Sequence, residues 1–213
     1  MEVIKFSKEN TELANNRAYE VLWAAGVVLC PTDTQYALLA WAVEDDAVEK
    51  IYSIKGRDEK KPLHALVSCV EMAELYSEEN VLARKLLGRS PKGKLTVVVT
   101  KRPQFSTGIL KNINTFAYRI PDDGFLTSLI DEFSMPVTAT SANRSGAQPE
   151  RSVEKILAQL GDSARDIGLV IDAGELPERQ PSTVVDLSGV QPVILREGAI
   201  SAADVWNAIR PEA

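Results

Sequence analysis

The apolar positions along the chain follow two different spacings. In several segments they recur every three to four residues, as on one face of an amphipathic helix. Between these segments lie short runs of β-branched and other apolar residues, which predict buried strands. We predict helices at residues 13–25, from Asp45, after Ser68, at 126–133, at 153–160 and after Ser201. We predict strands at 26–30, 37–41, 64–67, 95–100, 115–120, 137–140, 169–173, 183–187 and 193–196.

Residues that favour helix ends delimit several of these helices. Ser68 and Glu71 form a capping-box pattern at the start of one helix. Ser201 is placed to cap the final helix. Gly26 and Gly161 are placed to end two others.

Strands and helices alternate along the whole chain, and no repeat or long linker interrupts them. This order predicts a single α/β domain over residues 1–213. We expect it to be built around one twisted, open, mostly mixed β-sheet flanked by helices. In such folds ligands bind where loops leave strand ends, so polar clusters at those positions are candidates for a site.

Composition narrows the class of protein. Of the 213 residues, 45% are apolar and 25% are charged, as in ordinary globular proteins. The net charge of −6 argues against a generic nucleic-acid coat. Two cysteines and one histidine are too few for a disulfide framework or a common Cys/His zinc site. No segment resembles a signal peptide or a membrane span, so we expect a cytoplasmic protein.

Two polar loops in the first third of the chain are candidates for ligand binding. Residues 31–36, Pro-Thr-Asp-Thr-Gln-Tyr, place hydroxyls and a carboxylate directly after a buried strand. They either bind a small polar ligand or form a turn whose side chains bond local backbone. A second loop carries Lys55, Arg57, Lys60 and Lys61. These cations either bind phosphate oxygens or are solvated and complement a helix dipole.

Two later segments place further polar groups after strands. Residues 138–146, Thr-Ala-Thr-Ser-Ala-Asn-Arg-Ser-Gly, either offer hydroxyls and backbone N–H groups to a phosphate or form a polar turn. They match neither the Walker pattern nor a nucleophile elbow, so Ser141 is not expected to be a hydrolase nucleophile. Ser182 and Arg196 lie at the ends of two further strands. Arg196, close to Gly198, either approaches an anion or forms a surface pair with Glu197.

The one histidine, His64, lies inside a predicted strand. A histidine in that position is more often a half-buried structural residue than a catalytic base. The sequence leaves both interpretations open.

No segment is decisive by itself, but their order along the chain is specific. Over roughly residues 15–205 the series resembles the YrdC-type threonylcarbamoyl-AMP synthase family. The motifs that carry the resemblance are Pro31-Thr-Asp-Thr-Gln-Tyr36, Lys55-Gly-Arg57, Leu95-Thr-Val-Val-Val99, Ala117-Tyr-Arg-Ile-Pro121, Thr140-Ser-Ala-Asn-Arg-Ser-Gly146, Ser182-Thr-Val-Val-Asp186 and Leu195-Arg-Glu-Gly-Ala-Ile-Ser201.

The resemblance implies a twisted YrdC-like α/β domain with a positively lined cavity. It implies a nucleotidyltransferase that joins L-threonine, bicarbonate or CO2, and ATP into threonylcarbamoyl-AMP, releasing pyrophosphate. ATP then serves as a substrate with Mg²⁺, and no tightly bound organic cofactor is implied. The product serves tRNA modification through a separate transferase, and some members were described as binding tRNA or double-stranded RNA. Larger members add a C-terminal domain, which we do not expect in a chain of this length.

The resemblance also assigns site residues by position. Lys55, Arg57, Ser141 and Asn143 correspond to catalytic residues. The implied ATP-binding residues are Arg57, Lys61, Thr115, Ser141, Pro149 and Arg196. The implied threonine-binding residues are Thr34, Leu66, Arg119, Ala139 and Ser182, with Arg119 opposite the threonine carboxylate.

The chain departs from the family pattern in two loops. Gln35 and Ala37 replace the usual Val and Gly, and residues 90–94 replace a Trp-Pro-Gly-Pro segment. A Cβ at position 37 narrows the approach to the implied threonine site. Two alternatives to a synthase follow. One is a paralogue that binds RNA or a nucleotide with little synthase activity, and the other is a regulatory nucleotide-binding module. Lys92, Lys94, Lys101 and Arg102 form either a basic patch for RNA or a solvated strand edge.

Overall fold

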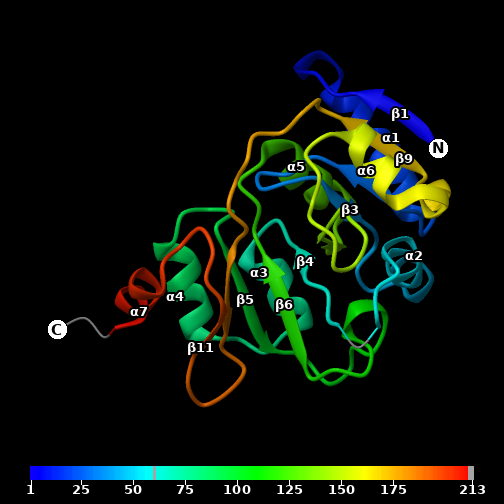
Figure 1. The fold of residues 1–213 in the computed structure, drawn as a ribbon. Coiled ribbons are helices and arrows are strands. Elements are labelled where there is room, and N and C mark those ends of the chain that lie inside the picture. Colours follow the sequence, from blue (N-terminus) through cyan, green and yellow to red (C-terminus); the bar gives the residue numbers. More distant parts are fainter. Residues whose placement is uncertain (60, 211–213) are drawn as a thin grey trace.

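The strands of this protein form two mixed β-sheets that meet edge to edge at the centre of the molecule (Figure 1). The computed structural model describes residues 1–59 and 61–210, so Lys60 of the basic loop lies outside the described residues. The helices are α1 (Thr11–Trp23), α2 (Asp45–Lys55), α3 (Val70–Tyr76), α4 (Val81–Arg89), α5 (Gly124–Phe133), α6 (Val153–Leu160) and α7 (Ala202–Ile209). Short 3-10 turns lie at η1 (Lys8–Asn10), η2 (Gly108–Leu110) and η3 (Gly161–Asp166).

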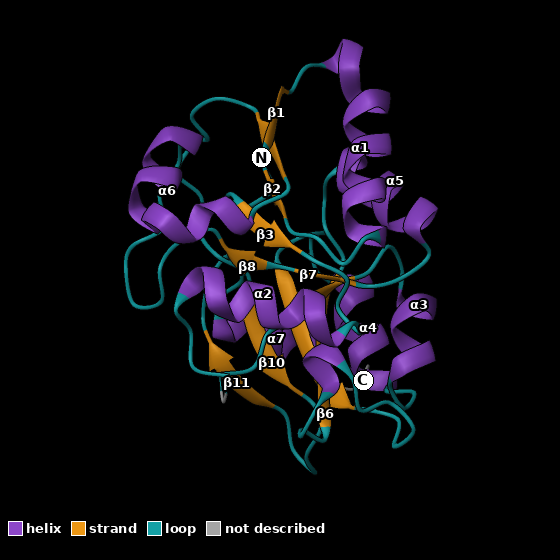
Figure 2. Cartoon of the chain, turned by 90° about the vertical axis from the view of Figure 1, so that its right-hand side faces the viewer, coloured by secondary structure: helices purple, strands orange, loops and turns teal. Residues whose placement is uncertain are grey.

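The first sheet has five strands and is covered on both faces. Its order is β1 (Glu2–Lys5), β9 (Leu169–Asp172), β2 (Val28–Cys30), β3 (Ala37–Leu39) and β8 (Thr140–Ser141). Val28 and Cys30 share a buried cluster with residues of α1 and α5, whereas Leu29 packs with residues of α2 and α6. This alternation follows from the twofold period of a strand. Figure 2 shows α1 and α5 side by side on one side of this sheet and α6 on the other.

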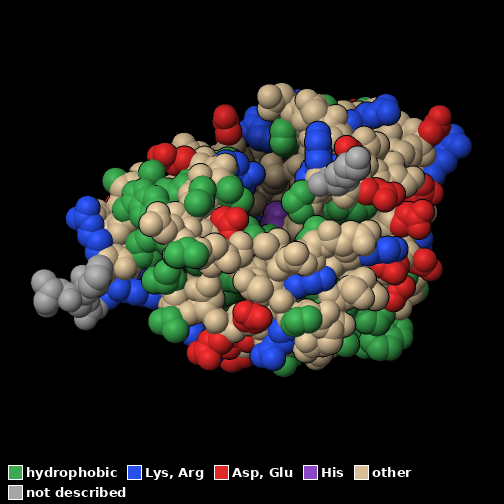
Figure 3. All heavy atoms as spheres, turned by 90° about the horizontal axis from the view of Figure 1, so that it is seen from below, with side chains coloured by type: hydrophobic (Ala, Val, Ile, Leu, Met, Phe, Trp, Pro, Cys, Tyr) green, Lys and Arg blue, Asp and Glu red, His purple; other side chains and the backbone are tan. Residues whose placement is uncertain are grey.

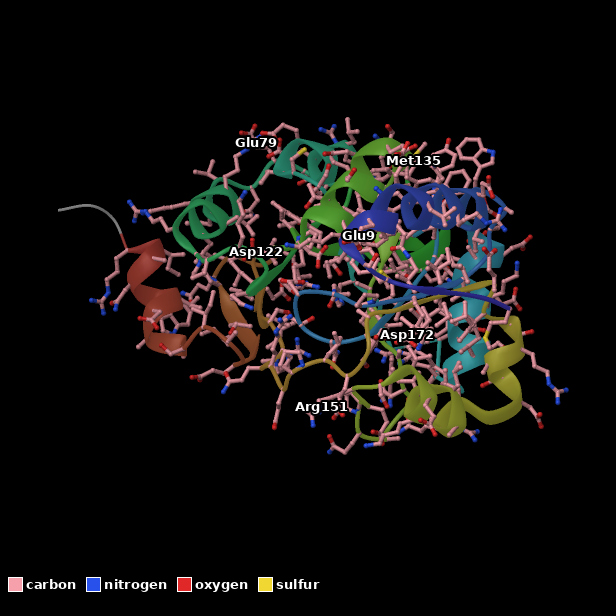
Figure 4. All side chains as sticks on the ribbon, turned by 90° about the horizontal axis from the view of Figure 1, so that it is seen from above. Glu9, Glu79, Asp122, Met135, Arg151 and Asp172 are labelled. Carbon is pink, nitrogen blue, oxygen red and sulfur yellow. The ribbon has the colours of Figure 1, made fainter. Side chains whose placement is uncertain are left out.

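The second sheet has six strands and a separate set of helices. Its order is β11 (Val193–Arg196), β10 (Thr183–Asp186), β5 (Leu95–Thr100), β6 (Thr115–Arg119), β4 (Ala65–Leu66) and β7 (Val137–Thr138). Residues of α3, α4 and α7 pack with the apolar side chains of β5, β6 and β10. The labelled residues of Figure 4 mark the two sheets: Asp122 follows β6, and Asp172 ends β9.

One short segment belongs to both sheets. Residues 137–141 start as β7 beside β4 and continue as β8 beside β3. Ala139, between the two strands, donates its N–H to the carbonyl of His64 at 3.0 Å. Thr138, one residue earlier, donates to Ala40 of the first sheet at 2.8 Å. The backbone therefore crosses from one sheet to the other without leaving hydrogen-bonded structure.

The mixed α/β class predicted from the sequence is confirmed, and several details differ. The strands form two sheets instead of one, because residues 137–141 divide between them. Helix α4 was not predicted. The capping box does not form, since Cys69 is the N-cap of α3 and makes no side-chain cap bond. At the end of α1 the left-handed residue is Ala25, with φ 53°, not Gly26.

Gly26 is required at that position for a different reason. A Cβ there would lie 2.7 Å from Cγ1 of Val21, closer than two carbons approach without a shift. The glycine thus serves a close contact, and the left-handed position of the turn belongs to Ala25.

Candidate functional site

A cavity of about 170 Å³ lies where the two sheets meet. We call it the junction cavity. Figure 3 views the molecule from below and shows a hollow with the one histidine side chain at its bottom and basic side chains at its rim. The junction cavity is lined by Thr32, Thr34, Gln35, Ala37, Arg57, Pro62, Leu63, His64, Arg119, Ala139, Thr140, Ser141, Pro181, Ser182 and Arg196.

The charged side chains that line the junction cavity, among the described residues, are three arginines: Arg57, Arg119 and Arg196. Each comes from a different part of the fold, namely the loop after α2, the end of β6 and the end of β11. A guanidinium stays protonated at any physiological pH. The junction cavity is therefore built to receive anionic groups.

Arg119 is the most deeply held of the three. It is 3% exposed, and its Nη1 donates to both carboxylate oxygens of Asp33, at 2.7 and 2.9 Å. The same nitrogen donates to the carbonyl of Gly93 at 3.1 Å. Asp33 also accepts from the N–H of Asp122 at 3.3 Å. These bonds fix the guanidinium in place and commit only one of its nitrogens.

The ion pair between Asp33 and Arg119 leaves no room for a side chain at position 93, which is a glycine. Its φ is +74°, and a Cβ built on it would overlap the Asp33 carboxylate. The loop over residues 90–94, which departs from the family pattern, therefore closes against the back of the arginine. Only glycine allows that approach.

Arg57 and Arg196 are held by carbonyl groups. Arg196 donates through Nε and Nη2 to the carbonyl of Ser182, at 3.2 and 2.8 Å. Arg57 donates to the carbonyls of Lys61 and Pro62, at 3.3 and 3.1 Å. Loss of hydration, and then the charge of Arg119, lower the pKa of Arg196. That shift is the expected effect of gathering like charges around one small space.

His64 lies at the floor of the junction cavity. Burial, followed by the charges of Arg119, Arg196 and Arg57, lowers the pKa of His64 to about 3. Its imidazole is therefore neutral at physiological pH and adds no charge to the arginines. No described residue makes a hydrogen bond to the ring.

Thr32 organises the loop that carries Thr34 and Gln35. Its Oγ1 accepts from the N–H groups of both residues at 3.1 Å and donates to the carbonyl of Gln35 at 2.7 Å. The turn that the sequence offered as one interpretation thus forms. It also presents Thr34 and Gln35 to the junction cavity, and ligand binding by this loop stays a prediction.

Lys55 supports the site from behind. It is 2% exposed, and its Nζ donates to the carbonyls of Ser141 and Asn143 and to the Asn143 side chain. Burial, and then the charge of Arg57, lower the pKa of Lys55 to about 7. The lysine therefore holds a loop of its own chain and does not line the junction cavity.

The loop held by Lys55 is closed by Asn143. The amide of Asn143 donates to the carbonyls of Arg144 and Ala147, at 2.9 and 2.7 Å. Its Oδ1 accepts from Ser141 Oγ as well as from Lys55. Ser141 thus lines the junction cavity while its hydroxyl is oriented by a buried amide.

The structure brings seven of the sequence-predicted site residues to the junction cavity and leaves six outside it. Lys55, Asn143 and Leu66 are buried behind it, and Lys61 and Pro149 are on the surface. Thr115 starts β6 whereas Arg119 ends it, about 13 Å apart at the usual rise of a strand. The seven that line it are Thr34, Arg57, Arg119, Ala139, Ser141, Ser182 and Arg196.

Sequence reasoning missed the part played by Asp33 and Gly93 in holding Arg119. The Pro-Thr-Asp-Thr motif pointed to Asp33, but nothing along the chain indicated a partner 86 residues away. The predicted basic patch is also weaker than its residue types suggest. Lys101 donates to two backbone carbonyls and Arg102 to two others, so both are engaged within the fold.

The described part of the chain contains no group of three or more His, Cys, Asp or Glu side chains placed to hold a metal ion. Neither does it contain a helix with the length and apolar character needed to cross a membrane.

Known proteins with a similar sequence identify the family of this chain. The Sua5/YciO/YrdC family model, described as "Telomere recombination", matches residues 20–198. A putative threonylcarbamoyl-AMP synthase of Methanocaldococcus jannaschii is 34% identical over 175 residues, covering 82% of this chain and 80% of the relative. The threonylcarbamoyl-AMP synthase of Bacillus subtilis is 32% identical over 187 residues, covering 87% of this chain. The chain spans about half the length of that relative, 53%.

A solved structure is similar over almost the whole chain. The crystal structure of P. abyssi Sua5 complexed with L-threonine matches with a TM-score of 0.82 at 29% identity. The match covers 98% of this chain and 59% of that one. With the family model covering 179 of the 213 residues (20 through 198), the chain belongs to the Sua5/YciO/YrdC family.

Proposed function

We propose that this protein is an L-threonylcarbamoyladenylate synthase. It joins L-threonine, bicarbonate or CO2, and ATP, and it releases pyrophosphate. The observation that carries the proposal is the junction cavity, in which three arginines face one small space. The names of the relatives from M. jannaschii and B. subtilis support the same activity.

The charge of the junction cavity suits this substrate set. Among the described residues, three guanidiniums line the junction cavity, and the carboxylate of Asp33 pairs with Arg119 outside the lining, which leaves two positive charges in excess. The reactants bring the threonine carboxylate, the carbamate and the ATP phosphates, all of them anionic. Each favourable pair formed there is partly desolvated, which strengthens it relative to a surface pair.

The size of the junction cavity indicates which part of the substrates it holds. At about 170 Å³ it is smaller than the roughly 300–1,000 Å³ of a site that encloses a drug-sized ligand. It accommodates the threonine carbamate and the phosphate that the carbamate attacks. The adenosine then extends out of the mouth of the junction cavity. Nucleotide binding there by Lys61, Thr115 and Pro149 stays a prediction.

The side chains divide between the two substrates. Arg57 and Arg196, with Ser141, bind the ATP phosphates. Arg119 binds the threonine carboxylate through Nε and Nη2, which donate to no described residue. Thr34 and Ser182 bind the polar groups of the amino acid, beside the backbone of Ala139. Lys55 and Asn143 act by holding Ser141 in place, and Leu66 packs behind the strand.

Catalysis in this arrangement is positioning and charge neutralisation. The carbamate oxygen attacks the α-phosphorus while pyrophosphate leaves, and fixed cations stabilise the charge that develops. Mg²⁺ enters with ATP, held by the phosphates. The product is an activated carbamate for tRNA modification, which a separate transferase in the cytoplasm consumes.

Pyrophosphate release tests the proposal. The purified protein is incubated with ATP, Mg²⁺ and bicarbonate, with L-threonine, with L-serine or with no amino acid. We expect release that requires both threonine and bicarbonate. Arg196→Ala should lower it by about tenfold or more, the loss of one charge-assisted contact.

The matched control is Arg165→Ala, which removes an arginine paired with Asp162 on the surface. It should leave pyrophosphate release unchanged. Release without threonine dependence, or no release from folded protein that binds ATP, would refute the synthase. The nucleotide-binding alternatives would then be tested through ATP and RNA affinity.

A further inference from the structure

We propose that His64 is a catalytic residue of this chain, the acceptor of the proton that threonine releases when it becomes a carbamate. The inference rests on the proposed synthase function and adds a proton-transfer step to it. It is carried by the position of the imidazole, by the absence of another base among the described residues that line the junction cavity, and by the charges around it.

The position of His64 is fixed by the backbone. Its carbonyl accepts from Ala139 where the two sheets join, and Ala65 and Leu66 continue directly into β4. Both neighbours are fully buried. The side chain lies at the bottom of the hollow seen in Figure 3, so it faces whatever fills the junction cavity.

Among the described residues, no other lining side chain can accept a proton near neutral pH. The polar ones are hydroxyls, the amide of Gln35 and three guanidiniums. Asp33 does not line the junction cavity, and Arg119 and Asp122 engage its carboxylate. Lys55 donates to three oxygens behind the wall. By contrast, the ring of His64 has no hydrogen-bond partner among the described residues.

The charges that face His64 are those of Arg57, Arg119 and Arg196, with Asp33 beyond Arg119. In the free protein burial, and then these cations, lower the pKa of the ring and hold it neutral, which leaves it able to accept a proton. Bound phosphates and a carboxylate offset their charge, and the pKa of the ring then rises toward its ordinary value. The base becomes stronger when the substrates are in place.

The step balances as follows. Threonine enters with its ammonium protonated and meets bicarbonate. One proton leaves the ammonium first, because the nitrogen needs a free electron pair. The amine then forms a bond to the carbon of bicarbonate, a C–O bond breaks, and the hydroxide leaves as water with a second proton from the nitrogen. The products are the carbamate, water and one proton, which His64 accepts on a ring nitrogen. The carbamate oxygen then attacks the α-phosphorus, pyrophosphate leaves, and the imidazolium returns its proton to solvent.

The test uses His64→Gln, which keeps a polar side chain but cannot accept a proton near neutral pH. We expect kcat for threonine-dependent pyrophosphate release to fall by about 100-fold, with KM for ATP changed by less than about threefold. The acid limb of the wild-type pH profile should disappear. Exogenous imidazole should restore part of the activity to His64→Ala.

A second readout does not depend on turnover. Binding of MgATP is measured by calorimetry at about pH 6 in buffers of different ionisation enthalpy. Wild-type protein should take up more protons than His64→Gln, because only the former has a ring whose pKa rises on binding. Circular dichroism shows whether each variant is folded, and His64→Asn replaces any that is not.

The outcomes separate this inference from the proposed function. An active wild type, with His64→Gln within about threefold of it and an unchanged pH profile, would overturn the role of His64 alone. A wild type that releases no pyrophosphate would overturn the synthase and, with it, this step. A structural role would lower activity without removing the acid limb or allowing rescue by imidazole.

Discussion

Replacing Asp33 by alanine tests the ion pair that holds Arg119 in the lining of the junction cavity. In the native protein the two side chains are 6% and 4% exposed and lie 2.7 Å apart. Asp33→Ala leaves the guanidinium buried without its carboxylate and beside two other arginines. Breaking a buried pair in this way typically costs about 3–5 kcal/mol. We therefore expect the free energy of unfolding to fall by about that amount.

The matched control is Asp162→Ala, which breaks the pair between Asp162 and Arg165. Its N–O distance of 2.9 Å is similar, but the side chains are 91% and 82% exposed. Solvent screens such a pair, so its loss should be close to neutral in stability. The two ion pairs have similar N–O distances and differ in how far their side chains are buried, so the two variants isolate the effect of burial.

Urea unfolding followed by circular dichroism measures the free energy of unfolding of both variants, and a thermal scan gives their Tm. For a chain of this length each kcal/mol shifts Tm by about 2–4 °C, so Asp33→Ala should lower Tm by about 6–20 °C. The double variant Asp33→Ala/Arg119→Met should recover part of the loss, because it removes the stranded charge. A loss below about 1 kcal/mol for Asp33→Ala would refute the reasoning, as would equal losses in the two single variants.

Three further predictions follow from described contacts. Between pH 6.5 and about 3 the unfolded chain binds a proton at His64 that the folded protein excludes. The free energy of unfolding therefore falls as pH falls, by up to about 1.4 kcal/mol per pH unit. Urea unfolding at about pH 6.5 and 4.5 should show a smaller fall in that free energy for His64→Gln than for the wild type. Cys69 is exposed, whereas Cys30 is buried and burial raises the pKa of its thiol; a thiol reagent should therefore modify one cysteine rapidly in native protein and both in denaturant. Asn143→Ala removes the oxygen that accepts from Lys55 and Ser141, and it removes two hydrogen bonds that the Asn143 amide donates. The free energy of unfolding should therefore fall by about 2–3 kcal/mol, and pyrophosphate release should drop with it.

The parts of the fold that local pattern determines were predicted well. The β-branched run over Leu95–Thr100 forms β5 with the predicted bounds, and Val193–Arg196 does the same for β11. Helix α4 escaped prediction because its buried positions are only Ala83 and Leu86, which give a faint helical period. Its start is set by Asn80, whose side chain accepts from the N–H of Ala83.

Features that depend on distant partners could not be predicted. The sequence predicts one continuous strand over residues 137–140, and only the positions of β3 and β4 divide it between two sheets. In the site, the residue types showed which side chains are cationic but not which of them face the junction cavity. Arg119 and Arg196 line the junction cavity, whereas Lys55 donates to the backbone carbonyls of Ser141 and Asn143. That difference depends on burial, which the spacing of charges does not reveal.

The segment that crosses between the sheets has a consequence for how ligands enter. Thr138, Ala139 and Ala142 donate to Ala40, His64 and Tyr36, so neighbouring amides are bonded to different sheets. Sliding one sheet against the other would break these bonds in succession, which makes the two sheets one cooperative unit around the junction cavity. Access must then come from motion of the surrounding loops. In hydrogen exchange, the amides of Thr138 and Ala139 should exchange only through global unfolding, while those of the loop that carries Arg57 exchange through local opening.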